Sequence, residues 1–275
     1  RPGPSPAKFF AVLLVVLTLT VAGLQLVPTV AAPPTSRGPG VTVSPVPEPS
    51  ATATPSTDAD STLMDNPIYR LQVSGSCPRI STPQSRTAYE QQVDGLLGCL
   101  ATIFRPLVEQ AHGTFGKVRH TYFGSAVDTP CGRESGAYAF YCEANATIYL
   151  SQAVYDGARY GRLSVSDTVI HEYGHHVQAM MGVFDAAEHL SEARAVTVRR
   201  EELQVFCWTY YVFASVPTFD LTDSDRTFFL DIWSNTQDAE GHGTVKAQQY
   251  WGARGLQGGN LGACNTWSVT KGQVR

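Results

Sequence analysis

The chain has 275 residues, 16% of them charged, a formal net charge of −4 and six cysteines. The charge content is below the usual level of about 25%, and the mild acidity argues against a nucleic-acid partner, which would require a basic patch. A hydrophobic content of 43% excludes a wholly disordered chain. The length allows one or two domains, each able to bury a core.

The N-terminus predicts export. Residues 9–32 carry no charge and follow Arg1 and Lys8. A positive end before an apolar stretch is typical of a secretion signal or a membrane anchor, and this stretch is also long enough to span a bilayer. We therefore expect residues 1–32 to be a signal peptide or an N-terminal membrane anchor. The protein would then be secreted, or anchored by a single pass with its folded domain extracytoplasmic.

A stalk is expected after this segment. Residues 33–60 contain seven prolines and nine serines or threonines, a composition that cannot bury enough apolar surface to become ordered. We expect residues 33–61 to be disordered and residues 62–275 to form one domain. All six cysteines lie in that domain.

Periodicity and turn residues place the main elements of the domain. In chain order we expect a helix over 86–111, strands at 117–123, 138–141 and 146–150, and helices over 165–181, 191–214, 223–235 and 244–254. Pro106 should kink or divide the first helix. Ser166 is the expected N-cap of the second helix and Gly182 its stop, and Ser191 should begin the third. Few strands followed mostly by helices predict an α+β fold, mainly helical with a small antiparallel sheet.

The helix expected over 165–181 carries the motif with the clearest chemistry, H-E-x-x-H, from His171 to His175. Residues four apart lie on one helix face, so both imidazoles can bind one Zn²⁺ ion at about 2.0–2.1 Å. Glu172 points elsewhere and is suited to take a proton from a water on that ion. The motif predicts zinc as cofactor and Glu172 as general base in the hydrolysis of an amide.

Within the same motif, Gly174 lowers helix propensity, which a close approach by a neighbouring element would explain.

A third ligand is required. The metzincin type would place a histidine at the position of Met181, whereas the glutamate-ligand type takes a carboxylate from the next helix. The candidates are Glu188, Glu192, Glu201 and Glu202. The last two lie on the helix expected over 191–214, and the helical pattern does not choose between them.

Two segments resemble a bacterial family of neutral zinc metallopeptidases. Residues 171–178 read HEYGHHVQ, as in its H-E-x-G-H-H-x-Q block, and residues 202–207 resemble its E-L-Q-x-x-C block. Weaker similarity extends over about 65–270. The resemblance implies a zincin-like domain, a peptide or protein substrate, and Glu202 as the third ligand.

One position departs from the family pattern. Many members carry an acidic residue four after the ligand glutamate, where it could orient a histidine, and this chain has Phe206. The departure leaves an alternative open, a noncatalytic cell-surface binding module that keeps the metal for stability. A hydrolase of cell-wall peptides or another amide would share the same site chemistry.

Substrate binding and oxyanion stabilisation require further residues. In peptidases of this type an edge strand commonly holds the substrate through backbone hydrogen bonds. We expect the strand at 146–150 to do so, with Tyr149 contacting the substrate. The developing oxyanion needs a donor, for which His242, Tyr141 and Tyr149 are candidates. We favour His242, which lies between two glycines. His176 should point away from the metal.

The six cysteines suit an exported domain braced by disulfides. Chain proximity and the expected elements suggest the pairs Cys77–Cys99, Cys131–Cys142 and Cys207–Cys264. The third pair would tie the helix carrying Glu202 to the C-terminal segment.

Overall fold

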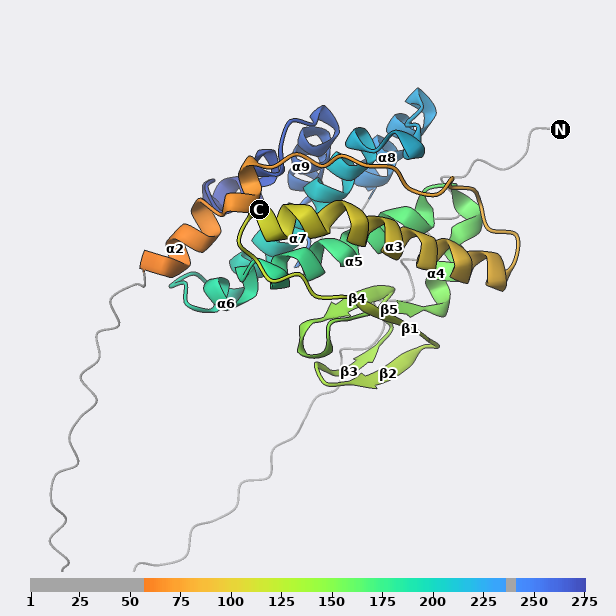
Figure 1. The fold of residues 1–275 in the computed structure, drawn as a ribbon, viewed down its shortest axis with the longest axis horizontal. Helices are drawn as coiled ribbons and strands as arrows, with labels where there is room; N and C mark the ends of the chain where they lie inside the picture. The colour runs from red at the N-terminus through yellow and green to blue at the C-terminus, as the bar shows by residue number, and fades with distance from the viewer. Residues whose placement is uncertain (1–56, 236–240) are drawn as a thin grey trace, which may run out of the picture. The chain divides into compact units, whose positions relative to one another are not determined.

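The computed structural model describes residues 57–235 and 241–275, and of residues 57, 58, 160 and 230–235 only the backbone (Figure 1). The expected signal or anchor segment and most of the expected stalk lie outside these residues. Within the described part of the chain, no helix combines the length and apolar character needed to cross a membrane.

Most of the described chain is helical. The helices are α2 (Thr57–Met64), α3 (Arg86–Gln110), α4 (Gln152–Gly157), α5 (Ser164–Met180), α6 (Val183–Glu188), α7 (Arg194–Ser215), α8 (Asp223–Asn235) and α9 (Val245–Gln257). The strands are β1 (Arg119–Phe123), β2 (Ala126–Thr129), β3 (Gly132–Ser135), β4 (Ala139–Cys142) and β5 (Thr147–Ser151). The mainly helical α+β class is confirmed. Helix α2 begins five residues before the domain boundary expected at 62.

The strands lie together on one side of the helices (Figure 1). Three of them form a sheet in the order β1-β5-β4, in which β1 is parallel and β4 antiparallel to β5, so this sheet is mixed. The remaining two, β2 and β3, form an antiparallel hairpin that the sequence pattern did not predict. Side chains of α3, α5, α7 and β5 meet in the core, including Leu96, Val169, Leu203 and Ile148.

The expected substrate strand is the middle strand of this sheet, so its assignment as an edge strand is wrong. Strands β1 and β4 pair with its two edges, and all five residues of β5 are buried. Alternation of side chains identifies a strand but not its neighbours, since pairing partners are set by tertiary structure. Among the described strands of this sheet, the edges belong to β1 and β4.

Helix α3 runs through Pro106 without being divided, contrary to expectation. Pro106 is exposed, so the carbonyl left without a backbone donor faces solvent. Ser85 caps the N-terminus by accepting from the backbone N–H of Ala88 at 3.1 Å.

The boundaries of α5 and α7 differ slightly from those expected. Helix α5 begins at Ser164 with Leu163 as its N-cap, so Ser166 lies inside the first turn rather than at the cap. It ends before Gly182, whose φ of 70° is the left-handed conformation expected of a stop. Helix α7 begins at Arg194, three residues after Ser191.

Helices α5 and α7 approach closely at Gly174. A Cβ built at Gly174 would lie 2.9 Å from Cβ of Val205, which is closer than side chains tolerate. The expected close approach is therefore confirmed, and the partner is α7. This contact brings the H-E-x-x-H helix within reach of side chains from the next long helix.

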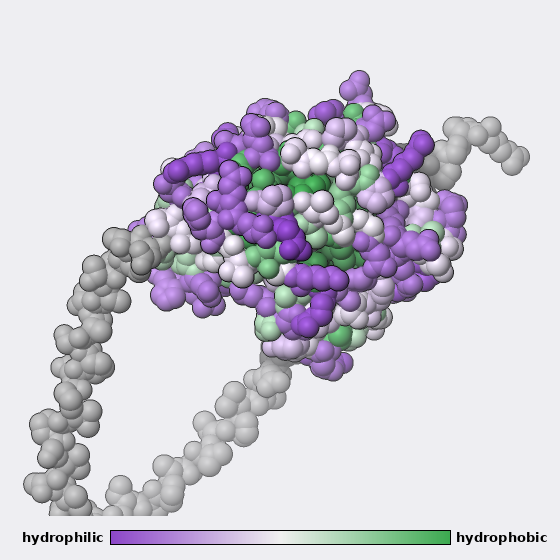
Figure 2. All heavy atoms as spheres, in the orientation of Figure 1, coloured by the Kyte–Doolittle hydropathy of each residue, from purple (hydrophilic) through white to green (hydrophobic). Residues whose placement is uncertain are grey.

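All three expected disulfides are present: Cys77–Cys99, Cys131–Cys142 and Cys207–Cys264. The third joins α7 to the C-terminal segment after α9. The second joins the turn of the β2–β3 hairpin to the end of β4. On the face seen in Figure 2, hydrophilic side chains surround a central area in which hydrophobic residues are visible.

Candidate metal centre

Helix α5 and helix α7 together assemble three potential metal ligands. His171 and His175 lie one turn apart on α5, with ring centroids 5.1 Å from each other. Glu202 of α7 faces both rings: Oε2 is 3.1 Å from Nε2 of His171, and Oε1 is 3.5 Å from Nε2 of His175. One potential ligand atom from each of the three residues lies within 4.8 Å of the others.

These distances suit zinc. Ligand atoms bound tetrahedrally at about 2.0–2.1 Å lie about 3.3–3.4 Å from one another. The two distances between imidazole nitrogen and carboxylate oxygen, 3.1 and 3.5 Å, bracket that value. Two neutral imidazoles and one carboxylate are also the ligand types of catalytic zinc sites, which keep a fourth position open.

Of the two adjacent glutamates, Glu202 is the one that faces both histidines. Glu201 instead pairs with Arg194, whose Nη1 is 3.1 Å from its carboxylate, although it also lines the cavity beside the histidines. Glu192 is engaged by Arg200 at 2.8 Å. The position of Glu202 therefore matches the ligand role that the family resemblance implies.

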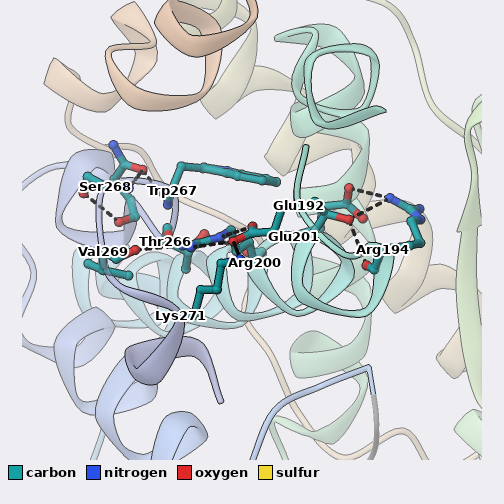
Figure 3. A network of polar contacts seen from close by, with 11 residues as sticks. Glu192, Arg194, Arg200, Glu201, Thr266, Trp267, Ser268, Val269 and Lys271 are labelled. Carbon is teal, nitrogen blue, oxygen red and sulfur yellow. Dashed lines mark hydrogen bonds and ion pairs between the residues drawn. The ribbon is translucent and has the colours of Figure 1, made fainter. Parts of the chain in front are cut away.

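A buried network holds this part of α7 in place (Figure 3). Arg200 is 6% exposed, pairs with Glu192, and donates to the backbone carbonyls of Thr266 and Val269. In return, the hydroxyl of Thr266 donates to the carbonyl of Arg200 at 2.7 Å. Together with Cys207–Cys264, these bonds fasten the turn that precedes Glu202 to the C-terminal segment.

A chain of amides orients His175. Its Nδ1 lies 3.0 Å from Oε1 of Gln178, which can only accept, so Nδ1 carries the proton and Nε2 is free for a metal. The amide nitrogen of Gln178 donates to Gln204 and to the carbonyl of Glu201. Gln204 in turn donates to the hydroxyl of Tyr69 at 2.9 Å.

Sequence reasoning missed these orienting residues, although both glutamines stand in the quoted motif blocks. Partners of this kind fix the tautomer of a metal-binding histidine. Gln178, supported by Gln204, orients His175, which is the role that an acidic residue at the position of Phe206 could have had. Phe206 itself packs edge-on against Tyr210, with ring centroids 5.0 Å apart.

Burial and charge shift the pKa values of the site in opposite directions. Burial would raise the pKa of Glu202, but His175 and His171 hold it well below its usual range. Burial disfavours the charged form of His175, yet the Glu202 carboxylate raises its pKa to about 9. For His171 burial prevails and lowers the pKa. The negative charge that a cation would meet is therefore carried by Glu202.

Glu172 is buried beside this cluster, with 6% of its surface exposed. Burial raises its pKa to about 7, opposed by His175 and by the backbone N–H of Tyr141. A carboxyl that titrates near neutrality can both accept and return a proton at working pH.

The remaining predicted residues lie at different distances from the cluster. His242 lies at the site: its Nε2 is 3.3 Å from Oε2 of Glu202, and 57% of its side chain is exposed. Tyr141 lines the same cavity. Tyr149 lies one layer behind, buried, with its ring stacked on Phe140 at 4.8 Å and its hydroxyl accepting from Asn145.

The cluster opens into a cavity of about 480 Å³. One wall is strand β4, from Ala139 to Tyr141, and Phe184 of α6 contributes to another. The ligand cluster and Glu172 therefore lie beside an edge strand, although a different one from that expected.

Two histidines one helical turn apart, a glutamate from the following helix and a buried carboxylate beside them have the composition and spacing of the His₂Glu class of H-E-x-x-H centres. The family model described as "Putative neutral zinc metallopeptidase" matches residues 64–223, more than half of the chain. The chain belongs to this family.

Proteins of two bacteria are similar to more than half of the chain. Uncharacterized protein Rv2575 of Mycobacterium tuberculosis is 29% identical over 179 residues, which cover 54% of this chain and 61% of that protein. Uncharacterized protein YpfJ of Escherichia coli is 26% identical over 186 residues, covering 58% of this chain and 64% of that protein. The matches thus span less than two thirds of these relatives. No solved structure is significantly similar to the chain.

Proposed function

We propose that residues 62–275 form a zinc-dependent peptidase that hydrolyses peptide bonds with a metal-activated water. The observation that carries the proposal is the placement of His171, His175 and Glu202 around one point, with Glu172 buried beside them and an edge strand along the same cavity. Membership of the metallopeptidase family supports it.

His171, His175 and Glu202 would hold Zn²⁺. The ion supplies polarisation of the scissile carbonyl and a water whose pKa is lowered towards 7. Glu172 accepts the proton of the attacking water and returns it to the leaving amine. Its burial keeps its pKa near that of such a water, so both transfers are feasible at neutral pH.

Strand β4 is suited to hold the substrate. The backbone N–H of Ser151 donates to the carbonyl of Tyr138, which sets the alternation of bonds along the β4–β5 pair. Ala139 and Tyr141 then direct their backbone groups away from β5. The N–H of Tyr141 faces Glu172, which leaves both groups of Ala139 and the carbonyl of Tyr141 for an extended peptide.

His242 is the favoured donor to the developing oxyanion. It lies at the rim of the ligand cluster, 3.3 Å from Glu202, and its exposure leaves room for substrate. The hydroxyl of Tyr141 is engaged by His176, and the hydroxyl of Tyr149 is buried behind Phe140. A donor at this position would stabilise negative charge on the carbonyl oxygen.

We further propose that the domain works outside the cytoplasm, because three disulfides require an oxidising compartment to form and persist. The protein would be secreted, or would contact the membrane through residues 1–32 if these are retained.

A peptide-library digest tests the proposal. Wild-type protein with zinc should cleave, a chelator should abolish cleavage, and Glu172→Gln should lower the rate by about 10²–10⁴-fold. Zinc content should stay near one equivalent in Glu172→Gln. Glu109→Gln, an exposed glutamate on α3, is the matched control and should cleave as wild type does.

Full activity in Glu172→Gln would contradict the mechanism. Zinc-dependent folding without cleavage of any library peptide would contradict the peptidase and favour a noncatalytic binding module stabilised by metal.

A further inference from the structure

Helix α5 presents a second pair of side chains one turn apart, beside the two histidine ligands. Glu172 and His176 are four residues apart, so they share a face of the helix, rotated from that of His171 and His175. The ligand face points to α7, where Glu202 lies. The second face points to strand β4, where both side chains meet the same residue, Tyr141.

Tyr141 contacts this second face through its backbone and through its side chain. Its backbone N–H lies close enough to Glu172 to lower the pKa of that carboxyl. Its hydroxyl lies 3.0 Å from Nδ1 of His176. A single residue of the edge strand therefore lines the cavity beside the general base and is hydrogen-bonded to a histidine one turn further along the helix.

The proton positions of His176 follow from its partners. Its Nε2 lies 2.9 Å from the carbonyl oxygen of Gly116, which can only accept, so Nε2 carries the hydrogen. The side chain is 2% exposed, and burial favours the neutral ring. Nδ1 is then an acceptor and the hydroxyl of Tyr141 is the donor. That hydroxyl proton is committed to His176 and is not directed at a substrate.

We propose that His176 is a positioning residue of the peptidase: through Tyr141 it fixes edge strand β4 against α5, and so sets the distance between Glu172 and a peptide held on β4. The proposal rests on the proposed function. The bond to Gly116 anchors the ring from the side opposite Tyr141, across 60 residues of sequence. A shift of this ring displaces the main-chain donor of Glu172 and the substrate-binding edge together.

Small displacements of a catalytic group have large kinetic consequences, because proton transfer requires a near-attack geometry. Loss of the Tyr141–His176 bond should therefore lower kcat by about tenfold while zinc stays bound. KM should change by less than about threefold, since the backbone groups of Ala139 remain on β4.

A double-mutant cycle tests the proposal. Tyr141→Phe removes the hydroxyl, and His176→Gln keeps a donor near the position of Nε2 but loses the acceptor at Nδ1. Each should lower kcat about tenfold, and the double variant should fall no further, because both remove the same bond. His176→Asn places an acceptor near the position of Nδ1 and should recover most of the wild-type kcat.

Tyr211→Phe is the matched control. The hydroxyl of Tyr211 is also engaged, donating to the carbonyl of Gly259 at 2.9 Å, but far along α7 from the cluster. Tyr211→Phe should lower the free energy of unfolding and leave kcat unchanged. A multiplicative loss in the double variant, or an equal fall of kcat in Tyr211→Phe, would overturn the positioning role.

Amide hydrogen exchange gives a readout that does not need activity. The Tyr141 amide should exchange at least tenfold faster in His176→Gln than in wild type. Its exchange rate in Tyr211→Phe should equal that of wild type. Unchanged exchange in His176→Gln would overturn the inference even if the enzyme cleaves peptides. If the Tyr141 amide exchanges faster in His176→Gln but the wild-type protein cleaves no peptide, the positioning role of His176 is supported and the proposed peptidase activity is contradicted.

Discussion

The two halves of the metal centre are built in different ways. On α5, His171 and His175 are held by one turn of a single helix, so the distance between them follows from local geometry. On α7, Glu202 reaches the same point from 31 residues further along the chain than His171. Its position depends on how two helices pack, which no local interaction determines.

The α7 half is accordingly held by contacts that are distant in sequence. Gly174 lets Val205 approach, Gln178 donates to the carbonyl of Glu201, and Arg200 ties the helix to the C-terminal segment. Metal affinity should therefore be sensitive to substitutions far from the ligands on the α7 side. On the α5 side, only changes to the ligands, to their direct partners or to the contact with α7 at Gly174 should matter.

The largest effect should come from the ligand supplied by α7. Glu202→Gln removes the charge that faces both histidines and should lower zinc affinity by at least about 100-fold. Glu201→Gln, one residue away and paired with Arg194, should change it less than about threefold. Competition with a chromophoric zinc chelator measures both. An equal loss in the two variants would remove the distinction between the adjacent glutamates.

Removing Cys207–Cys264 should cost about 4 kcal/mol of unfolding free energy, because this bridge closes a loop of 57 residues. Removing Cys131–Cys142, which closes 11 residues, should cost about 3 kcal/mol. Urea unfolding of the two double-alanine variants measures both losses. Zinc affinity should fall only in the first variant, since that bridge holds α7. A fall confined to the second would contradict the comparison.

Gly174→Ala tests the packing of α5 on α7. The added methyl would meet Val205 at 2.9 Å and should destabilise the protein by about 1–3 kcal/mol while weakening zinc binding. Removing the obstructing side chain in Gly174→Ala/Val205→Ala should restore zinc affinity. Gly98→Ala, where a Cβ meets nothing within 4 Å on α3, is the control and should stabilise slightly. Zinc affinity unchanged in Gly174→Ala would argue against the close approach.

The smallest effect concerns Asp167, one turn before His171, where α5 meets Tyr210 of α7. Burial raises the pKa of Asp167 to about 6 from its usual 3.8, opposed by the Tyr210 hydroxyl. Protonated Asp167 therefore contributes to the free energy of unfolding. This contribution is complete below pH 3.8 and is lost as the pH rises through 6. The difference in free energy of unfolding between Asp167→Asn and wild type should therefore grow in favour of the variant by roughly 1–2 kcal/mol from pH 4 to pH 7, allowing for the partial exposure of Asp167.

Urea unfolding of both proteins across that pH range measures the gain. A difference between Asp167→Asn and wild type that is independent of pH would contradict the raised pKa.

Strong periodic patterns predicted the long elements well. The helices expected over 86–111 and 223–235 match α3 and α8 closely, and the apolar stripe of α3 faces the core. The short hairpin β2–β3 was missed because its exposed and half-buried residues carry no clear alternation. Pro106 did not divide α3, since an exposed position lets water satisfy the freed carbonyl.

Residues at the candidate site were predictable in proportion to how local their geometry is. The H-E-x-x-H spacing placed three of them on one helix, and the family resemblance added Glu202. The orienting glutamines, Gln178 and Gln204, stood in the quoted motifs without a recognised role, because their partners come from different helices. The substrate edge was misassigned for the same reason: the order β1-β5-β4 is a tertiary property.

The sequence by itself determined the class of fold, the disulfide pairs and the two histidines with their neighbouring glutamate, because each depends on periodicity or spacing along the chain. Helical periodicity did not choose between Glu201 and Glu202; the tertiary structure shows that Glu202 faces the histidines, as the resemblance implied, and that β4 rather than β5 lines the cavity. It also decided that Tyr141 joins Glu172 to His176. These depend on the rotation of α7 and the order of the strands, which are set by packing between segments that no local pattern links.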